Sequence, residues 1–469
     1  MQQRLFIILC LLFSLSMSAQ AAQGNASSKK RFFGRKGAMY RVAFTDKRGC
    51  SYSLNHPHRF LSRRSIERRQ RQGIAIDSTD LPVSARYLYQ LSCLPLQIVG
   101  SSRWLNSVLV FCSDTTVARS IARLDFVKQT TCVWISPDSI IREPYHKSVQ
   151  KEFNPWDSVA TTIYGMAKEQ LEMTGTLSLH QRGYKGKGIS IAVLDGGFEN
   201  VHHIKAFKDT HIKGTNDFVF PQSPSVYKEV DHGTKVLSVL AANAPHVMMG
   251  AAPDASYWLL RCEDQQSEQP VEEDYWVMAA EYADSVGVDI INSSLGYTQF
   301  DHHLGDHNLS EMDGNTAYIS KAASMLADKG IILVSSAGNH GMGAWKKLSF
   351  PADAHDILTV GAITASRQNA PFSSVGPTQD GRIKPDVMAL GSATWLLSGR
   401  GRLTQDMGTS FATPLISGLV ACLWQAHPKK TAKEIIEIIR KSGDNYLTPN
   451  NITGYGLPCI SSPLTPRTE

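Results

Sequence analysis

The fold is decided by the stretch ISIAVLDGG at residues 189–197. Six residues, apolar except for one serine, run into an aspartate and two glycines. Such a run is typical of a strand that is buried on both faces, as in a parallel sheet covered by helices. Open sheets of this kind bind ligands beyond the carboxyl ends of their strands, so Asp195 is the first candidate functional residue.

Similar runs alternate with helical patterns along the rest of the chain. Residues 289–295, 331–336 and 357–363 are short, apolar and rich in β-branched residues, so each predicts another buried strand. Residues 272–286 and 315–327 have helical spacing, and a glycine closes each. The alternation predicts an α/β fold of three layers, with a mostly parallel central sheet between helices.

A serine motif provides the candidate nucleophile. The sequence GTSFATP at residues 408–414 surrounds Ser410 with small residues, and Pro414 predicts the first turn of a buried helix. The positive end of that helix favours negative charge on a carbonyl oxygen bound beside Ser410. An isolated serine in this place is usually only a helix N-cap, and as a nucleophile it needs a base within hydrogen-bonding reach.

The candidate base is His232, in the sequence DHGTKV at residues 231–236. It precedes an apolar helix predicted at 236–242, where a lone histidine is usually a capping or surface residue. Asp195 changes this interpretation, because a carboxylate at the end of a core strand is costly to bury without a partner. A histidine whose tautomer must be fixed and whose positive charge must be stabilised is a natural partner.

Asn339 is the fourth candidate, in the sequence SAGNHG at residues 336–341, directly after a predicted strand. A glycine-flanked asparagine is often only a turn residue. Its side-chain amide can also donate a hydrogen bond to an oxyanion, and losing one such donor raises a reaction barrier by about 2.7–4 kcal/mol.

These four motifs, in the order Asp, His, Asn, Ser, resemble those of the subtilisin-like serine peptidases over about residues 164–458. Further matches are GAAP at 250–253, SLG at 294–296, FSSVG at 372–376 and KPDV at 384–387. The resemblance implies a subtilisin-like fold with Asp195, His232 and Ser410 as a catalytic triad. It also places Asn339 in the oxyanion hole.

The same resemblance implies where a peptide substrate would bind. An extended peptide would add as a strand along the edge formed by Ser294, Leu295 and Gly296. The walls of the primary pocket would come from Ser335, Ser336, Ala337 and Gly338, and Ser349 would lie near its base. None of these segments contains an acid, so we expect an apolar or permissive preference in this pocket.

Two positions depart from the family pattern, but neither makes or breaks bonds in the family. Gly196 replaces the usual serine or threonine after the catalytic aspartate, and Lys235 replaces a common histidine. The expected chemistry requires no cofactor, and no Cys or His spacing is that of structural zinc, so no metal ligands are assigned. Calcium sites are frequent in the family, but no motif of this sequence assigns one. The acidic loop residues that are candidates are Asp301, Glu311 and Asp313.

The start of the chain predicts export. Residues 1–21 combine a positive charge, a short apolar run and small residues near Ala21, the pattern of a cleaved signal peptide. The alternative of a membrane anchor is disfavoured, since the run is shorter than the ~20 residues that span a bilayer. We therefore expect an extracellular, cell-surface or periplasmic protein without a membrane span after signal removal. Residues 22–38, rich in Ser, Lys and Arg, predict a flexible leader.

Residues 39–135 predict a small α+β domain. Strands are expected at 40–44, 104–112 and 127–135, and helices at 60–73 and 116–124. By resemblance this is a prodomain that assists folding and inhibits the enzyme. Proline-bearing residues 136–163 are expected to be a linker with the processing site, followed by the peptidase domain at 164–460 and a tail at 461–469.

The charge distribution suggests how the two parts meet. Residues 1–150 hold 22 Lys and Arg against 8 Asp and Glu, a net +14, whereas the remainder has a net charge of −8. We expect the basic front to dock on the acidic body, rather than on nucleic acid. The alternative is a solvated basic helix face that has no partner.

The cysteines leave several pairings open. The chain has eight, and Cys10 lies in the export signal. Export permits disulfides, and the four cysteines between residues 50 and 132 allow three pairings. The odd number that remains implies at least one free thiol.

The chain is therefore expected to be a secreted serine endopeptidase that acts on polypeptides and is made as a self-processed zymogen. The first alternative is a catalytically silent binding protein on the same scaffold, although no triad residue is missing. The second is an esterase or lipase, which would need a G-x-S-x-G elbow; Ala412 stands where its second glycine belongs.

Overall fold

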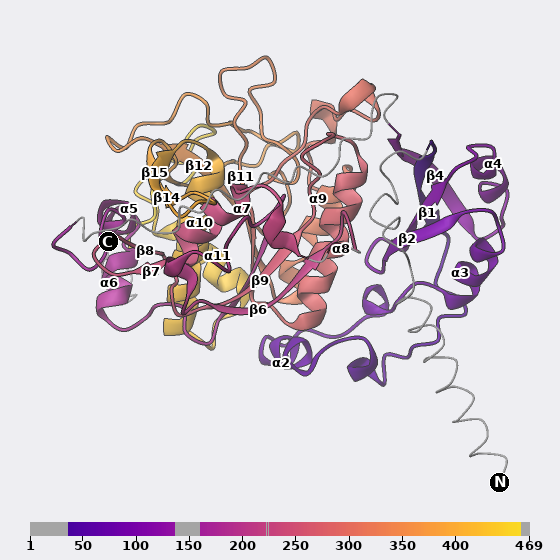
Figure 1. The fold of residues 1–469 in the computed structure, drawn as a ribbon, viewed down its shortest axis with the longest axis horizontal. Coiled ribbons are helices and arrows are strands. Elements are labelled where there is room, and N and C mark those ends of the chain that lie inside the picture. Colours follow the sequence, from indigo (N-terminus) through magenta and orange to yellow (C-terminus); the bar gives the residue numbers. More distant parts are fainter. Residues whose placement is uncertain (1–35, 137–159, 222, 224, 461–469) are drawn as a thin grey trace, which may run out of the picture.

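The computed structural model describes residues 36–136, 160–221, 223 and 225–460 (Figure 1). The expected export signal and tail lie outside the described residues, and so do nearly all of the leader and the linker. Residues 36–136 form a smaller part, indigo to purple in Figure 1, beside the larger part formed by the rest. Within the described residues, no helix combines the length and the apolar character needed to cross a membrane.

The larger part is built on a seven-stranded sheet whose neighbouring strands are all parallel. In order across the sheet the strands are β13 (Val387–Leu390), β12 (Leu358–Ile363), β11 (Ile332–Ser336), β10 (Ile290–Ser293), β5 (Ser190–Asp195), β9 (Ser256–Arg261) and β6 (His211–Asp217). All six residues of β5 are buried. The prediction of a mostly parallel α/β sheet is confirmed.

Helices cover both faces of this sheet, because successive residues of a buried strand point to opposite sides. Ile191 and Val193 of β5 pack in one core with α7 (His232–Ala241) and α10 (Thr409–Ala426). Ala192 and Leu194 pack in the other core with α8 (Val271–Val286) and α9 (Tyr318–Ser324). The three layers follow from this alternation.

The remaining elements of the larger part are short. The helices are α5 (Lys168–Met173), α6 (Thr176–Gln181) and α11 (Ala432–Lys441). The strand pairs are β7 (Asn243–Ala244) with β8 (Met248–Met249) and β14 (Thr394–Leu397) with β15 (Leu403–Asp406). Single 3₁₀ turns are η4 (Lys205–Phe207), η5 (Val226–Lys228), η6 (Asp301–His303), η7 (Leu309–Glu311) and η8 (Ala327–Lys329).

The smaller part has an antiparallel sheet in the order β2-β3-β1-β4. Its elements are β1 (Ala38–Phe44), η2 (Pro57–Arg59), α2 (Arg63–Arg71), η3 (Ser78–Asp80), α3 (Ala85–Ser92), β2 (Gln97–Ser102), β3 (Ser107–Cys112), α4 (Val117–Ile121) and β4 (Val127–Ile135). Val108 and Val110 face its own core, while Leu109 and Phe111 pack with residues of α8. The sheet therefore buries one face against its own helices and the other against the larger part.

Several predicted boundaries are corrected by the structure. The helix predicted at 236–242 is α7, which begins at His232, so the histidine lies in its first turn instead of before it. The strand expected at 104–112 begins at Ser107, because Asn106 has left-handed backbone with φ 50° and Ser102 Oγ accepts from the Leu105 amide, which makes a turn. The helix expected at 315–327 is α9, which ends at Ser324 and is followed by the separate turn η8.

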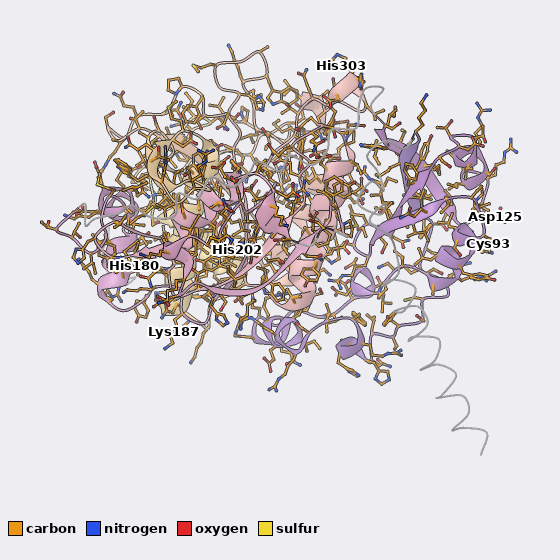
Figure 2. All side chains as sticks on the ribbon, viewed as in Figure 1. Cys93, Asp125, His180, Lys187, His202 and His303 are labelled. Atoms are coloured by element: carbon orange, nitrogen blue, oxygen red, sulfur yellow. The ribbon has the colours of Figure 1, made fainter. Side chains whose placement is uncertain are left out.

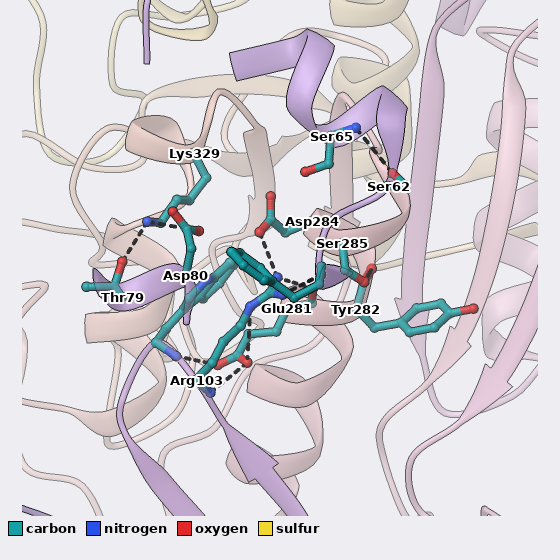
Figure 3. A network of polar contacts seen from close by, with 12 residues as sticks. Ser62, Ser65, Thr79, Asp80, Arg103, Glu281, Tyr282, Asp284, Ser285 and Lys329 are labelled. Atoms are coloured by element: carbon teal, nitrogen blue, oxygen red, sulfur yellow. Dashed lines mark hydrogen bonds and ion pairs between the residues drawn. The ribbon is translucent and has the colours of Figure 1, made fainter. Parts of the chain in front are cut away.

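Buried arginines join the smaller part to α8. Three arginines, Arg68 and Arg69 of α2 and Arg103, donate hydrogen bonds to the Asp284 carboxylate. The distance to a carboxylate oxygen is 2.8 Å from Arg69 Nη1 and also 2.8 Å from Arg103 Nη2. Figure 3 shows Arg103 and Asp284 of this network together with Glu281, which accepts from the backbone amide of Arg103 at 2.9 Å. The expected docking of a basic front on an acidic body is thus present in these contacts. The alternative of a solvated basic face does not hold for Arg68 and Arg69, which are fully buried.

The cysteines of the described part all carry free thiols. Cys112, Cys262 and Cys422 are buried, and Cys93 lies exposed on the smaller part (Figure 2). The sequence-based expectation of at least one free thiol is met, and no disulfide forms among residues 36–136 and 160–460 as far as they are described.

Candidate active site

The candidate residues meet at the carboxyl edge of the central sheet. Asp195 is the last residue of β5, Ser294 follows β10, and Asn339 lies three residues after the end of β11. Since β5, β10 and β11 are parallel neighbours, the residues that follow them share one edge. Ser410 reaches the same edge from the first turn of α10, and its hydroxyl donates to the Ser294 carbonyl at 3.1 Å.

Asp195 and His232 form a bidentate contact. Nδ1 of His232 lies 3.0 Å from both carboxylate oxygens, and Asp195 Oδ1 also accepts from the Gly196 amide at 2.8 Å. A carboxylate can only accept, so the imidazole must carry its proton on Nδ1. In the neutral ring, Nε2 is then the atom that can take up a proton.

The environment of His232 favours its charged form. Burial disfavours the imidazolium, but the Asp195 carboxylate and the hydrogen bond to it outweigh this and raise the pKa of His232 to about 9. Glu263 acts in the same direction. Burial, followed by repulsion from Asp195, in turn raises the pKa of Glu263 to about 7.

Ser410 is buried, at 8% exposed. The His232 ring packs against the next residue, Phe411, with ring centroids 5.7 Å apart. The hydroxyl of Ser410 is bound to Ser294 rather than to His232 in this structure. A reactive arrangement therefore needs Ser410 Oγ to turn from the Ser294 carbonyl to His232 Nε2, and such contacts often tighten only with substrate bound.

Asn339 is anchored through its oxygen and leaves its nitrogen available. Asn339 Oδ1 accepts from the backbone amide of Thr409 at 2.9 Å and from its hydroxyl at 3.0 Å. The residue is exposed, so the two Nδ2 hydrogens can serve a ligand. The Thr409 backbone amide can only donate, so this bond fixes which end of the Asn339 side chain carries the oxygen.

The expected pocket residues are contiguous. A Cβ on Gly338, which has φ +105°, would lie 2.4 Å from Ser349 Oγ, and a Cβ on Gly296 would lie 2.6 Å from Ser349 Cβ. Ser349 also donates its amide to Ala337 at 3.0 Å. The buried members of this set are Ser294, Leu295, Ser335, Ser336, Ala337 and Ser349. Only glycine fits at 296 and 338, where the two walls approach Ser349.

Sequence reasoning missed two residues of this site. Thr409 anchors Asn339, and its only signal was its place directly before Ser410 in the quoted motif. Glu263 comes two residues after β9, a strand that the sequence analysis did not identify. A Cβ on Gly196 would lie 2.9 Å from Glu263 Oε2, so this carboxylate is a direct neighbour of the residue after Asp195.

The acidic loop candidates for calcium are used in other contacts. Asp301 Oδ2 accepts from the Glu268 amide at 3.0 Å, Asp313 Oδ1 accepts from the Thr316 amide at 2.7 Å, and Glu311 Oε2 contacts His307 Nδ1 at 3.0 Å. In the described part of the chain, no three His, Cys, Asp or Glu side chains are grouped so as to hold a metal ion.

Comparisons with known proteins find two family matches. A family model described as the subtilase family matches residues 186–456, and one described as the peptidase S8 propeptide domain of Bacteroidota matches residues 39–151. Among curated relatives, subtilisin NAT of Bacillus subtilis subsp. natto is 30% identical over 284 residues, which are 60% of this chain and 66% of that protein.

Two further relatives match this chain over a similar length. The subtilisin of Bacillus pumilus is 28% identical over 60% of this chain and 92% of its own length. A thermostable alkaline protease of Halalkalibacterium halodurans is 26% identical over 67% of this chain and 77% of its own. The matching stretch spans slightly less than two thirds of subtilisin NAT, and identity to all three is 30% or lower.

Proposed function

The chain belongs to the subtilase family, and on this premise we propose that it is an exported serine endopeptidase made as a zymogen. In this proposal Ser410 is the nucleophile, His232 is the general base, and Asp195 orients and stabilises His232. The observation that carries it is the contact of both Asp195 oxygens with His232 Nδ1 at 3.0 Å, together with the packing of Phe411, the residue after Ser410, against the His232 ring.

The proposed reaction follows from the proton positions. Ser410 Oγ turns to His232 and attacks the scissile carbonyl carbon while Nε2 takes its proton; the carbonyl electron pair moves to the oxygen. Asn339 Nδ2 and the Ser410 amide donate to this oxyanion. The C–N bond then breaks as His232 returns the proton to the amine, and water, activated in the same way, releases the acyl group.

The proposed domain division keeps the bounds predicted from the sequence. Residues 1–21 would be the export signal, 22–38 a leader, 39–135 the prodomain, 136–163 the segment cut during maturation, 164–460 the peptidase and 461–469 a tail. The propeptide match at 39–151 supports the assignment of the front part, and the buried contacts of α2 with α8 support an inhibitor that docks on its own enzyme. Ser294, Leu295 and Gly296 are the proposed peptide-binding edge.

Substrate turnover together with covalent labelling tests this function. The full chain, after maturation, is expected to hydrolyse a fluorogenic peptide, and a sulfonyl fluoride is expected to stop turnover and to add its mass to the peptide that contains Ser410. A nitrophenyl ester of matched size is measured in parallel. Ester turnover without peptide turnover would instead identify an esterase, and peptide binding without turnover or label would identify the silent binding protein.

Asn339→Ala is expected to lower kcat by about 10²–10³-fold with little change in KM. The reason is that Asn339 Nδ2 would donate a hydrogen bond to the oxygen of the scissile carbonyl only when negative charge develops on that oxygen in the transition state. Steady-state kinetics on the same peptide give both constants. Asn315→Ala, at an exposed loop position, is the matched control and should retain wild-type constants. A rise in KM alone would assign Asn339 to substrate binding instead.

The pH dependence of kcat/KM is expected to rise through the pKa of His232, about 9, because only the neutral imidazole can take the serine proton. Glu263→Gln removes a negative charge that favours the imidazolium, so the rising limb should shift to lower pH. Glu172→Gln, at an exposed position of α5, should leave the limb in place. A limb that Glu263→Gln does not move would contradict the electrostatic coupling of these two residues.

A further inference from the structure

Three carboxylates lie beside the candidate active site without basic partners. Glu263, Glu268 and Glu272 come from the loop after β9 and from the start of α8, and none forms an ion pair with a Lys, Arg or His of the described residues. The nearest cation along the chain, Arg261, is bound to Asp217 at 3.1 Å and to Glu229 at 3.5 Å instead. Attraction to His232 partly offsets the charge of Glu263, whereas no cation is among the main causes that shift the pKa of Glu268 or Glu272.

A buried tyrosine hydroxyl adds an independent observation. Tyr297 is 1% exposed, and its hydroxyl has no hydrogen-bond partner in the described structure. The Asp301 amide donates to the Glu268 carbonyl at 2.7 Å, so the segment that follows Tyr297 lies against the loop of Glu268. Burial, followed by charges that include those of Glu272, Glu263 and Glu268, raises the pKa of Tyr297. An unpaired buried polar group is costly, so this hydroxyl points to a missing partner.

The same region adjoins the proposed path of a substrate. Tyr297 directly follows Gly296 of the proposed peptide-binding edge, and Glu263 Oε2 lies beside Gly196, the neighbour of Asp195. Both residues follow strands that end at the carboxyl edge of the sheet, where a peptide bound to the proposed edge and reaching Ser410 would also lie. One of its side chains could thus reach the carboxylates without leaving the edge.

The three carboxylates differ in the hydrogen bonds that they already accept, and so in their capacity to bind a ligand. Glu272 accepts from the backbone amides of Asp264 at 2.6 Å and Gln269 at 3.3 Å, so it holds the loop. Glu268 has no hydrogen bond to its side chain among the described contacts, and burial and the nearby Glu263 raise its pKa to about 7. Glu263 Oε2 accepts only from Gln265, at 2.7 Å. Glu268 and Glu263 are therefore the acids available to a ligand.

The front part of the chain ends at this loop. The Ile135 amide donates to Gln269 Oε1 at 2.8 Å, and Gln269 Nε2 donates back to the Ile135 carbonyl at 3.2 Å. Ile135 is the last residue of β4, and the first basic residues that follow it in the sequence are Arg142 and Lys147. The segment proposed to be cut in maturation thus starts beside the carboxylates and carries cationic side chains.

We propose that Glu263, Glu268 and the Tyr297 hydroxyl form a subsite for the lysine or arginine side chain of a peptide substrate, within a few residues of the bond that is cut. This inference rests on the proposed peptidase function and adds a substrate class to it. An ammonium or guanidinium group supplies several donors and a positive charge, and so can serve both the carboxylates and the hydroxyl. The primary pocket, whose walls contain no acid, keeps its separate apolar or permissive preference.

A peptide library and matched variants test the subsite. The mature protein is incubated with a peptide library, and mass spectrometry locates the cut sites. One position within four residues of the cut is expected to favour Lys or Arg, with about 10-fold higher kcat/KM than for norleucine in a matched pair of peptides. Glu268→Gln should reduce this ratio to near 1, and Glu268→Lys should reverse it in favour of a glutamate peptide.

Two further variants separate the subsite from general damage. Tyr297→Phe, which removes only the hydroxyl, should lower the same ratio, and Glu172→Gln on α5 should not. If the wild type cuts both peptides equally well, the subsite is wrong while the peptidase function stands. If it cuts no peptide, both are wrong. If calcium alone raises the Tm of the wild type and not that of Glu268→Gln, the acids form a cation site and the inference is overturned.

Discussion

Ser410→Ala is expected to lower kcat for peptide hydrolysis on the order of 10⁶-fold, the size of loss that follows removal of a triad nucleophile. Without Oγ there is no atom to form the acyl intermediate, although Asn339 and the substrate edge remain. The Ser410 hydroxyl also accounts for only one bond in the structure, to the Ser294 carbonyl, so the variant should keep its fold. Equal thermal unfolding of the variant and of wild-type chain that is not yet cut would show this.

The same variant tests maturation. Intact masses of the purified full chain, followed over time, should show that the wild type loses a fragment ending within residues 136–163 while Ser410→Ala stays whole. Ser366→Ala, in an exposed loop, should mature as the wild type does. A Ser410→Ala chain that is still cut when purified alone would rule out self-processing. If both stay whole, the hydrolysis of an added peptide is measured next. Hydrolysis by the whole chain would show that the front part is a permanent domain, and its absence would indicate that removal of the front part needs another protease.

Asp284→Asn is expected to weaken the docking of α2 on α8 by about 3–5 kcal/mol, because it leaves buried arginines without their shared carboxylate. The Asp284 side chain is fully buried and binds Arg68, Arg69 and Arg103. Hydrogen exchange of α2 amides in the full chain, with Ser410→Ala to prevent cleavage, should therefore be faster by about 10²–10⁴-fold. Unchanged exchange would show that the contact of the two parts depends on apolar packing instead.

A matched control lies on the same helix. Glu67 pairs only with Arg63 on the exposed face of α2, and Glu67→Gln should leave exchange nearly unchanged, since exposed pairs contribute little. The ion cluster should also resist acid. Burial opposes ionisation, but the three arginines lower the pKa of Asp284 to about 2, below its ordinary value near 4. A lowered pKa stabilises the folded form above pH 4, and this contribution is lost as the pH falls toward 2.

Secondary structure could be predicted where a fully buried strand appears in the sequence as a continuous run of apolar or small residues. Strands β5, β10, β11 and β12 are buried along their whole length, so their residues are almost all apolar or small. Strand β6 was missed because it is the edge strand and alternates between exposed and partly buried residues, with a glycine in its middle. Its sequence, HIKGTND, lacks the run that identifies the others.

The sequence by itself determined the family, the parallel α/β fold and the residues proposed for catalysis, because these depend on short motifs and on the burial pattern of single strands. Only the tertiary structure decided which residues surround them. Glu263 and Glu268 follow β9 and Tyr297 follows β10, two strands that end at the same edge on either side of β5, although up to 34 positions separate these residues. The charge pattern predicted that the front is basic and the body acidic. That Asp284 is the buried acceptor followed only from the packing of α2 against α8. Net charge predicts that the two parts attract each other, but only the packed structure shows which side chains pair.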